Sequence, residues 1–308
     1  MAGKPELADS VGRLLVTSET YTGFYQHFAV AVHGAITSEP GAALSIAVAS
    51  YLWWTGAEAF DDLADGDADM SIHGLQPSEF LIAATLCLSE LPLRVIGRQE
   101  LPQAIKEDWI SDFLETSITA ASGQLKDTRS GENANITWQG VMESYAAKTG
   151  APYARDAAMA ARLATDHLPT LRSWRALGAL FGVLRQLHND RSAASALDDN
   201  DLINGTHTLL LAHALEVLPD QQADDVHQLR PLARHQLEER TKLWHLLRDP
   251  AVATSYDSRV ETLRRHARHL LDQTAPPSAY RDALAQMIDS SATAAMLTRE
   301  TASAQAVQ

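Results

Sequence analysis

Helical periodicity runs through nearly the whole sequence and limits the fold more than any other feature. In residues 102–125, for example, Ile105, Trp109 and Phe113 recur at every fourth position, the spacing of one helix face. Thr116 continues the same face. Strict alternation of apolar and polar residues, the pattern of a half-buried strand, is almost absent. The sequence therefore predicts an all-α protein built as a single large helical bundle.

Short turns rather than long linkers separate the expected helices. Residues that favour turns cluster in segments such as "TSEPG", "SIHGLQP" and "DDNDLING", and Thr137 is expected to cap a helix. Further helical stretches are expected over residues 41–62, 137–164, 169–190, 206–218, 226–247, 257–272 and 277–297. We expect one helical domain over residues 1–297, followed by a flexible C-terminal tail over residues 298–308.

The charge balance narrows the class of partner. The chain has 308 residues, with 25 Lys plus Arg against 39 Asp plus Glu, and a net charge of −14. Nucleic acid and anionic membrane surfaces both need a basic face, so neither is expected as a partner. An acidic protein that binds an anionic substrate is expected to need metal ions.

The single cysteine and the N-terminus bear on the compartment. Because Cys87 is the only cysteine, an intramolecular disulfide and a thiolate metal cluster are both excluded. The N-terminus "MAGKPELADS" has no basic run followed by an apolar stretch, and no window approaches the roughly 20 apolar residues of a membrane span. We expect a soluble, cytoplasmic protein without a membrane span.

The segment "EAFDDLADGD" crowds carboxylates at the end of an apolar helix. Asp61 and Asp65 are four residues apart, so they project side by side, with Asp62 at their flank. Like charges at that spacing repel, and a helix end disfavours negative charge, so the cluster costs stability unless cations occupy it. Clustered oxygen ligands without His or Cys suit Mg²⁺. The alternative interpretation is a solvated acidic helix end. The apolar stretch "YLWWTGAEAF" directly before the cluster argues against it.

A second polar cluster closes the helix expected over residues 169–190. It contains Gln186, Asn189 and Asp190. Two such clusters, each ending an apolar helix, could face each other across one pocket. The alternative for "HNDRS" is a helix C-terminus that runs into a turn.

These segments together resemble a known family. "DDLAD" resembles the first aspartate-rich motif, DDxxD, of the trans-prenyltransferase branch of the isoprenoid synthase superfamily. Four further segments are similar to that family's motifs and follow in the same order: "GQLKD" (123–127), "YAAKTG" (145–150), "GVLRQLHND" (182–190) and "NGTHTLLLAHAL" (204–215). The resemblance covers roughly residues 20–220. It implies a helical bundle around a central active-site cavity, and homodimers are common among such proteins.

The resemblance also implies a cofactor and roles for individual residues. The expected cofactor is Mg²⁺, as a cluster of about three ions. The metal ligands would be Asp61, Asp65, Asn189 and Asp190, with Asp62 beside them as a further catalytic carboxylate. The substrate diphosphate would be bound by Lys148, Gln186 and Gln124. Lys148 has the alternative of a surface lysine whose stem lies along the helix.

An allylic cation needs a dry pocket with aromatic faces. Trp54 lies two helical turns before Asp61, on the same face. The resemblance implies that Ala57 and Gly56 set the depth of the prenyl pocket, with Trp54 or Trp53 as its floor. Core packing is the alternative role for these tryptophans. Further candidates for the pocket lining are Phe113, Tyr145, Thr149, Trp174 and Phe181.

The departures from the family pattern point to the reaction. Chain-elongating members carry a Gly-Lys-Arg segment near the N-terminus and an Arg pair after the first motif, whereas this chain has "HGAITSEPGAALS" and then Asp67 and Asp69. The second motif has Ala193 in place of a third carboxylate, and Thr206 replaces a later Lys. The resemblance therefore implies that the allylic diphosphate site survives and the isopentenyl diphosphate site does not.

The predicted function is that of a Mg²⁺-dependent class I terpene synthase, similar to the class IB enzymes, acting on a C10 to C20 prenyl diphosphate. The alternative is a prenyltransferase with a second, non-isopentenyl acceptor, as in the ComQ-type enzymes that prenylate a peptide tryptophan and the moenomycin farnesyl-transfer enzyme. A chain-elongating synthase and a non-catalytic partner subunit are less favoured, the latter because "DDLAD" is intact.

Overall fold

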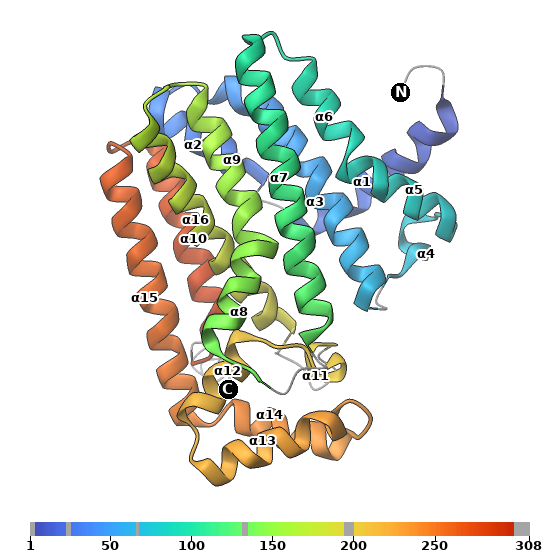
Figure 1. Cartoon of the computed structure of the whole chain (residues 1–308), viewed down its shortest axis with the longest axis vertical. Helices are drawn as coiled ribbons and strands as arrows, with labels where there is room; N and C mark the ends of the chain where they lie inside the picture. The colour runs from blue at the N-terminus through green and yellow to red at the C-terminus, as the bar shows by residue number, and fades with distance from the viewer. Residues whose placement is uncertain (1–3, 23–25, 66–67, 131–134, 194–199, 299–308) are drawn as a thin grey trace, which may run out of the picture. The chain divides into compact units, whose positions relative to one another are not determined.

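The computed structural model describes residues 4–22, 26–65, 68–130, 135–193 and 200–298. Within these ranges the regular structure is helical and no strand occurs, as Figure 1 shows. The prediction of an all-α protein is therefore confirmed. Of the tail predicted over residues 298–308, all but Thr298 lies outside the described residues.

The chain divides into two compact units, each assembled from separate stretches. Unit 1 comprises Met1–Ile118, Ala154–Arg175 and Thr274–Leu284. Unit 2 comprises Thr119–Tyr153, Ala176–Gln273 and Ala285–Gln308. The expectation of one helical domain over residues 1–297 stays a prediction.

The helices follow one another with short connections. The first part of the chain forms α1 (Pro5–Thr22), α2 (Phe28–Thr37), η2 (Pro40–Ala43), α3 (Leu44–Asp65), α4 (Met70–His73), α5 (Pro77–Leu88), α6 (Glu90–Gly97) and α7 (Gln103–Thr128). The middle part forms α8 (Trp138–Tyr145), η4 (Ala146–Gly150), α9 (Ala151–Arg162) and α10 (Leu168–Ala193). The last part forms α11 (Asn200–Asn204), α12 (Leu209–Val217), α13 (Asp220–Ala233), α14 (Leu237–Leu247), α15 (Pro250–Thr274) and α16 (Ala279–Ala295).

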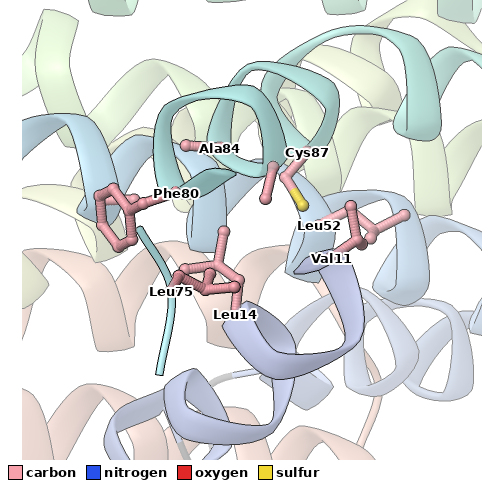
Figure 2. Close-up of a cluster of buried hydrophobic side chains, with 9 residues drawn as sticks. Val11, Leu14, Leu52, Leu75, Phe80, Ala84 and Cys87 are labelled. Carbon is pink, nitrogen blue, oxygen red and sulfur yellow. The ribbon is translucent and has the colours of Figure 1, made fainter. Parts of the chain in front are cut away.

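A hydrophobic cluster holds α1, α3 and α5 of unit 1 together. Figure 2 shows Val11 and Leu14 of α1 beside Leu52 of α3 and Phe80 and Cys87 of α5. Each of these side chains is at most 8% exposed. Burying a side chain of this size contributes about 1.5–3 kcal/mol, so the cluster stabilises the packing of α3 against α1 and α5.

Helix α3 approaches α5 closely at Gly56. A Cβ atom at this position would come within 2.7 Å of the Ala84 carbonyl oxygen and 2.8 Å of the Leu88 side chain. Glycine is therefore required for the helix contact. Helix α3, which carries the first acidic motif, therefore packs tightly against α5 about one turn before Asp61.

The apolar segment Pro77–Gly97 is the one place where the described residues differ from the expected absence of a membrane-span pattern. By length and composition alone it could cross a membrane. In the structure it is interrupted at Ser89, between α5 and α6. Phe80 and Cys87 pack into the hydrophobic cluster. Core helices of folded proteins pass the same compositional test, and 33% of the apolar window of this segment is buried.

In unit 2, the helix predicted over residues 226–247 is two helices, so that prediction is wrong. Helix α13 ends at Ala233 and α14 begins at Leu237. Pro231 has no amide hydrogen to continue the ladder, and the Arg240 guanidinium donates to the Ala233 carbonyl oxygen at 2.9 Å. This cap from the next helix satisfies a carbonyl group at the end of α13, and α14 packs against α13.

The stretch predicted as one helix over residues 137–164 is helical but not uniform. Thr137 caps α8 as predicted, because its hydroxyl oxygen accepts a hydrogen bond from the Gly140 amide at 3.1 Å. The segment Ala146–Gly150 then widens into a π-helical turn, η4, before α9 begins. Such turns are rare and occur often at functional sites. Here the turn carries Lys148 and Thr149.

Candidate active site

The first acidic motif lies at the C-terminal end of α3 in unit 1. Asp61 is half-buried and Asp62 is exposed. Asp65 is the last residue of the helix, and its side chain, like all of Asp67, lies outside the described residues. The helical placement of Asp61 and Asp65 agrees with the prediction, whereas their roles as metal ligands stay predictions.

Asp69 has a local structural role. Its carboxylate accepts hydrogen bonds from the Ser71 amide at 3.0 Å and the Ser71 hydroxyl at 2.5 Å, which caps α4. These hydrogen bonds lower the pKa of Asp69. The carboxylate that replaces an expected arginine therefore also organises the turn after the first motif.

The tryptophans before the motif differ in burial. Trp53 is buried and donates its indole N–H to the Ser117 hydroxyl at 3.0 Å. Trp54 is half-buried, with its ring 5.0 Å from that of Trp53 in a T-shaped arrangement. Ala57 is half-buried, and Gly56 faces α5, so the glycine serves helix packing. The floor of a prenyl pocket at Trp53 or Trp54 stays a prediction.

Unit 1 contains a buried ion pair that the sequence analysis missed. The Arg155 guanidinium donates to the Asp156 carboxylate at 2.9 Å, and the other carboxylate oxygen accepts from the Ser50 hydroxyl at 2.5 Å. The guanidinium carbon lies 4.0 Å from the centre of the Phe113 ring and 5.2 Å from that of Trp53. Burial raises the pKa of Asp156, although Arg155 and Ser50 oppose the rise.

The ion pair involves one residue that was predicted to line the pocket. Phe113, predicted to line the prenyl pocket, presents a ring face to Arg155. The only sequence signal was the dipeptide Arg155-Asp156 inside the otherwise apolar "PYARDAAMAA".

A second polar cluster, in unit 2, brings together five of the predicted site residues. Asp190 of α10 accepts hydrogen bonds from the Tyr145 hydroxyl and, at 3.0 Å, from the Gln186 amide. Gln186 in turn accepts from the Thr149 hydroxyl at 2.6 Å. Lys148 pairs with Asp127 of α7 at 2.9 Å. We call these residues the Asp190 network: Asp127, Tyr145, Lys148, Thr149, Gln186 and Asp190.

The π-helical turn and a close helix contact build this network. The widened turn η4 presents Lys148 and Thr149 from consecutive positions. A Cβ atom at Gly182 of α10 would lie 2.5 Å from the Thr149 carbonyl oxygen, so only glycine lets α10 approach the turn this closely. One helical turn after Gly182, Gln186 then reaches Thr149.

Burial governs the electrostatics of the network. It raises the pKa of Asp190 to about 7, against the opposing effect of the hydrogen bonds from Tyr145 and Gln186. Burial and the adjacent carboxylate raise the pKa of Tyr145 well above its usual value, so the phenol remains a donor. Tyr145 and Thr149 were predicted to line a prenyl pocket. Their hydroxyls belong to the polar network, and their place in a pocket lining stays a prediction.

The remaining predicted residues lie apart from these contacts. Asn189 is exposed on α10, and Gln124 is half-buried on α7. Phe181 is buried, with its ring 5.0 Å from that of Tyr153, and Trp174 is fully buried. Lys148 is only 17% exposed, so the alternative of a surface lysine does not hold.

The donor chemistry fits the implied metal ion. Carboxylate and amide oxygens at Asp61, Asp190 and Asn189 are the hard ligands that Mg²⁺ prefers. Within the part of the chain that the structure describes, no group of three or more His, Cys, Asp or Glu side chains is arranged to hold a metal ion. That description leaves out the side chain of Asp65.

Comparison with known proteins identifies the fold. No protein-family model and no curated protein matches the sequence. The chain is similar to the solved structure of geranylgeranyl pyrophosphate synthetase from Pyrococcus horikoshii, with a TM-score of 0.77 and 19% identity over 94% of this chain and 95% of that chain. A decaprenyl diphosphate synthase from Rhodobacter capsulatus gives a TM-score of 0.79 at 11% identity over 96% of this chain and 92% of that chain.

A third similar structure contains ligands. It is a polyprenyl synthase from Caulobacter crescentus complexed with calcium and isoprenyl diphosphate, with a TM-score of 0.76 and 15% identity over 94% of this chain and 95% of that chain. The chain therefore has the all-α fold of these prenyl and polyprenyl synthase structures.

Proposed function

We propose that the protein is a Mg²⁺-dependent class I terpene synthase that ionises one allylic prenyl diphosphate of C10 to C20 and cyclises or quenches the cation. The Asp190 network carries this proposal. It gathers an acidic acceptor, an amide and a lysine on a π-helical turn and α10 of a prenyl synthase fold. The carboxylates of Asp61 and Asp65 on α3 supply a second set of hard oxygen ligands.

In this proposal, residues of the Asp190 network act on the diphosphate, which is the leaving group. When bound, Mg²⁺ supplies Lewis-acid neutralisation of the diphosphate charge that builds up as the carbon–oxygen bond breaks. Lys148 provides a fixed positive charge, and Asp127 orients its ammonium group, which has three donors to share. Gln186 is held between Thr149 and Asp190, so its amide orientation is set before substrate binds.

Chain elongation, the activity named for the similar structures, is less well supported. A second diphosphate would need cations of its own. Residues 33–45 contain no Lys or Arg, and the His33 ring in that segment is buried, with its Nδ1 3.0 Å from the Ala160 carbonyl oxygen. After the first motif, Asp69 presents a carboxylate that caps α4.

A second candidate function is transfer of the prenyl group to a non-isopentenyl acceptor. The observation that favours it is a largely apolar pocket that borders Asp190 in unit 2. A terpene synthase needs only the prenyl diphosphate, whereas this candidate predicts no organic product until an aromatic, peptide or other acceptor is added. A homodimer and a cytoplasmic location stay predictions for both candidates.

Turnover of prenyl diphosphates tests the proposal. We expect the purified protein with Mg²⁺ and a C10, C15 or C20 diphosphate to release diphosphate and form a hydrocarbon or alcohol, detected by mass spectrometry. Replacing Asp61→Ala and Asp65→Ala together should abolish turnover while the helical circular dichroism is kept. If no substrate releases diphosphate, with or without candidate acceptors, the proposal is wrong.

A further inference from the structure

The hydroxyl of Tyr145 connects three helices of unit 2. Tyr145 is the last residue of α8 and is 3% exposed. Its hydroxyl donates a hydrogen bond to the Asp190 carboxylate of α10 and accepts one, at 3.3 Å, from the Leu209 amide of α12. A phenol oxygen can donate one hydrogen bond and still accept another, so this one atom serves both partners.

The contact with Leu209 lies at the start of α12. The first four amides of a helix have no carbonyl partner within that helix. At this end the Thr208 hydroxyl accepts a hydrogen bond from the Leu211 amide at 3.2 Å, and Tyr145 accepts one from the Leu209 amide. Because Leu209 is fully buried, its amide depends on a protein partner rather than on bulk water. The backbone of α12 therefore fixes the position of the Tyr145 oxygen.

Two further contacts fix helix α8 itself. The Ser144 hydroxyl donates to the Gly123 carbonyl oxygen of α7 at 3.3 Å. At the other end of α8, the Trp138 ring lies 6.0 Å from the ring of His213 on α12. The orientation of Tyr145 is therefore set by the fold before any ligand binds.

Packing alone does not explain the hydroxyl group of Tyr145. A phenylalanine ring would fill the same buried space without a polar atom. Burying a hydroxyl has a free-energy cost that its hydrogen bonds do little more than offset. The hydroxyl is therefore better explained by what it does to its partner Asp190.

Tyr145 and Gln186 hold the Asp190 carboxylate without saturating it. Oδ2 accepts from the Tyr145 hydroxyl, and Oδ1 accepts from the Gln186 amide at 3.0 Å. A carboxylate has about four lone-pair sites, so these two hydrogen bonds leave acceptor capacity on both oxygens. Asp190 also borders the largely apolar pocket of unit 2. A carboxylate that is oriented and still able to accept suits a metal ligand, and losing the partner that orients such a ligand typically costs about 10–100-fold in metal affinity.

We propose that Tyr145 is a positioning residue that holds the Asp190 carboxylate in the orientation that binds a divalent metal ion. Tyr145 touches neither the metal ion nor the diphosphate and acts only through Asp190. This inference rests on the proposed function, in which Asp190 is a metal ligand, and deepens it by naming the residue that sets the metal affinity.

Binding of Mn²⁺ to the full chain in the presence of inorganic diphosphate, followed by electron paramagnetic resonance, tests the proposal. Mn²⁺ takes the same hard oxygen ligands as Mg²⁺. Tyr145→Phe should weaken Mn²⁺ binding by about 10–100-fold, at a temperature where circular dichroism shows the variant to be folded. The matched control is Tyr51→Phe, because the Tyr51 hydroxyl donates to the Leu15 carbonyl oxygen at 2.6 Å, in unit 1. This control should bind Mn²⁺ within about twofold of the unchanged chain.

Two further comparisons separate positioning from packing. Adding Tyr145→Phe to Asp190→Asn should cause no further loss of Mn²⁺ binding, because Tyr145 acts through Asp190. Replacing Tyr145 by 4-aminophenylalanine keeps a donor and should restore most of the binding, whereas 4-fluorophenylalanine fills the space without a donor and should behave like Tyr145→Phe. These two analogues decide the question where Tyr145→Phe does not fold.

The results that would overturn the inference differ from those that would overturn the proposed function. Unchanged Mn²⁺ binding in Tyr145→Phe, equal binding with the two analogues, an equal loss in Tyr51→Phe, or an additive loss in the double variant would each reject the positioning role. Absence of Mn²⁺ binding by the unchanged chain would reject it as well. Mn²⁺ binding that depends on Tyr145, without turnover of any prenyl diphosphate, would reject only the proposed function.

Discussion

The buried ion pair of unit 1 and the lysine pair of unit 2 lie about two helical turns apart in the sequence but differ in their surroundings. Arg155 is fully buried, stacked on Phe113 and paired with its neighbour Asp156. Lys148 and Asp127 keep 17% and 13% of their side chains exposed and adjoin the Asp190 network.

The difference predicts a structural role for the Arg155–Asp156 pair and, under the proposed function, a binding role for Lys148. A sealed pair cannot exchange its partner for a ligand, and losing one member leaves a charge without compensation. A pair that retains access to solvent can share its donors with an incoming anion. The two clusters should therefore respond to substitution in opposite ways, one in stability and the other in activity.

The largest expected effect is on the sealed pair. Asp156→Ala should lower the free energy of unfolding by about 3–5 kcal/mol, because Arg155 stays buried without its carboxylate. Urea unfolding followed by circular dichroism measures this loss. The double change Arg155→Met with Asp156→Ala should recover part of it. A loss below about 1 kcal/mol in the single variant would contradict the account of a sealed, interdependent pair.

The next largest effect is expected on the packing of α10 against η4, which brings the residues of the Asp190 network together. Gly182→Ala should cost about 1–3 kcal/mol, because its Cβ would meet the Thr149 carbonyl oxygen and force α10 away from η4. The matched control is Gly97→Ala, where nothing lies within 4 Å of the added atom. Thermal unfolding of both variants provides the comparison. Equal stability would show that the close approach is not needed.

Substitution of Lys148 should affect activity more than stability. Lys148→Gln should change the free energy of unfolding by at most about 1 kcal/mol, because the pair it leaves retains solvent access. The same change should lower kcat/KM for a prenyl diphosphate at least about tenfold, since a fixed cation on the leaving group is lost. Steady-state diphosphate release measures the effect. Full activity with reduced stability in this variant would show that Lys148 has a structural role, like the Arg155–Asp156 pair.

The smallest expected effect is an acid sensitivity of unit 2. His213 of α12 is 1% exposed, and its Nε2 lies 2.8 Å from the Ser255 hydroxyl. Burial and then Arg259 lower its pKa below the ordinary value of 6.5, with Glu216 opposing. The folded state therefore binds fewer protons than the unfolded state, and the contribution of His213 to stability is present above pH 6.5 and is lost as the pH falls below that value.

Hydrogen exchange locates this acid effect. Protection of α12 should fall between pH 7.5 and pH 5.5, and His213→Gln should reduce that fall, because glutamine does not titrate. Protection of α5 in unit 1 is the internal control. If protection falls equally in α12 and α5, or falls as much in His213→Gln as in the unchanged chain, His213 is not the cause of the acid sensitivity.

The sequence predicted the helical class and much of the Asp190 network. Periodicity of apolar residues is a local property, so most helices were found, including the capped start at Thr137. Gln186 and Asp190 were singled out because a polar cluster closes an apolar helix, and Lys148 and Thr149 because of the family resemblance. Their mutual hydrogen bonds were not predictable, because these depend on a π-helical turn and on the approach of α10 at Gly182.

Other features depended on contacts between different helices. The break between α13 and α14 was missed because its cap comes from Arg240 in the following helix. The Arg155–Asp156 pair was missed because only tertiary packing brings Ser50 and Phe113 to it. The pocket that borders Asp190 combines helices whose separate patterns gave no sign of a cavity.

By itself, then, the sequence determined the all-α class and the helical placement of Asp61 and Asp65, because these follow from spacing along one helix. The candidates for a diphosphate site came from the family resemblance of its motifs. Only the tertiary structure decided which of the paired charges are sealed from solvent and which keep access to it. The reason is that burial and pairing of a charge are set by side chains brought from far along the chain, and no local pattern encodes them.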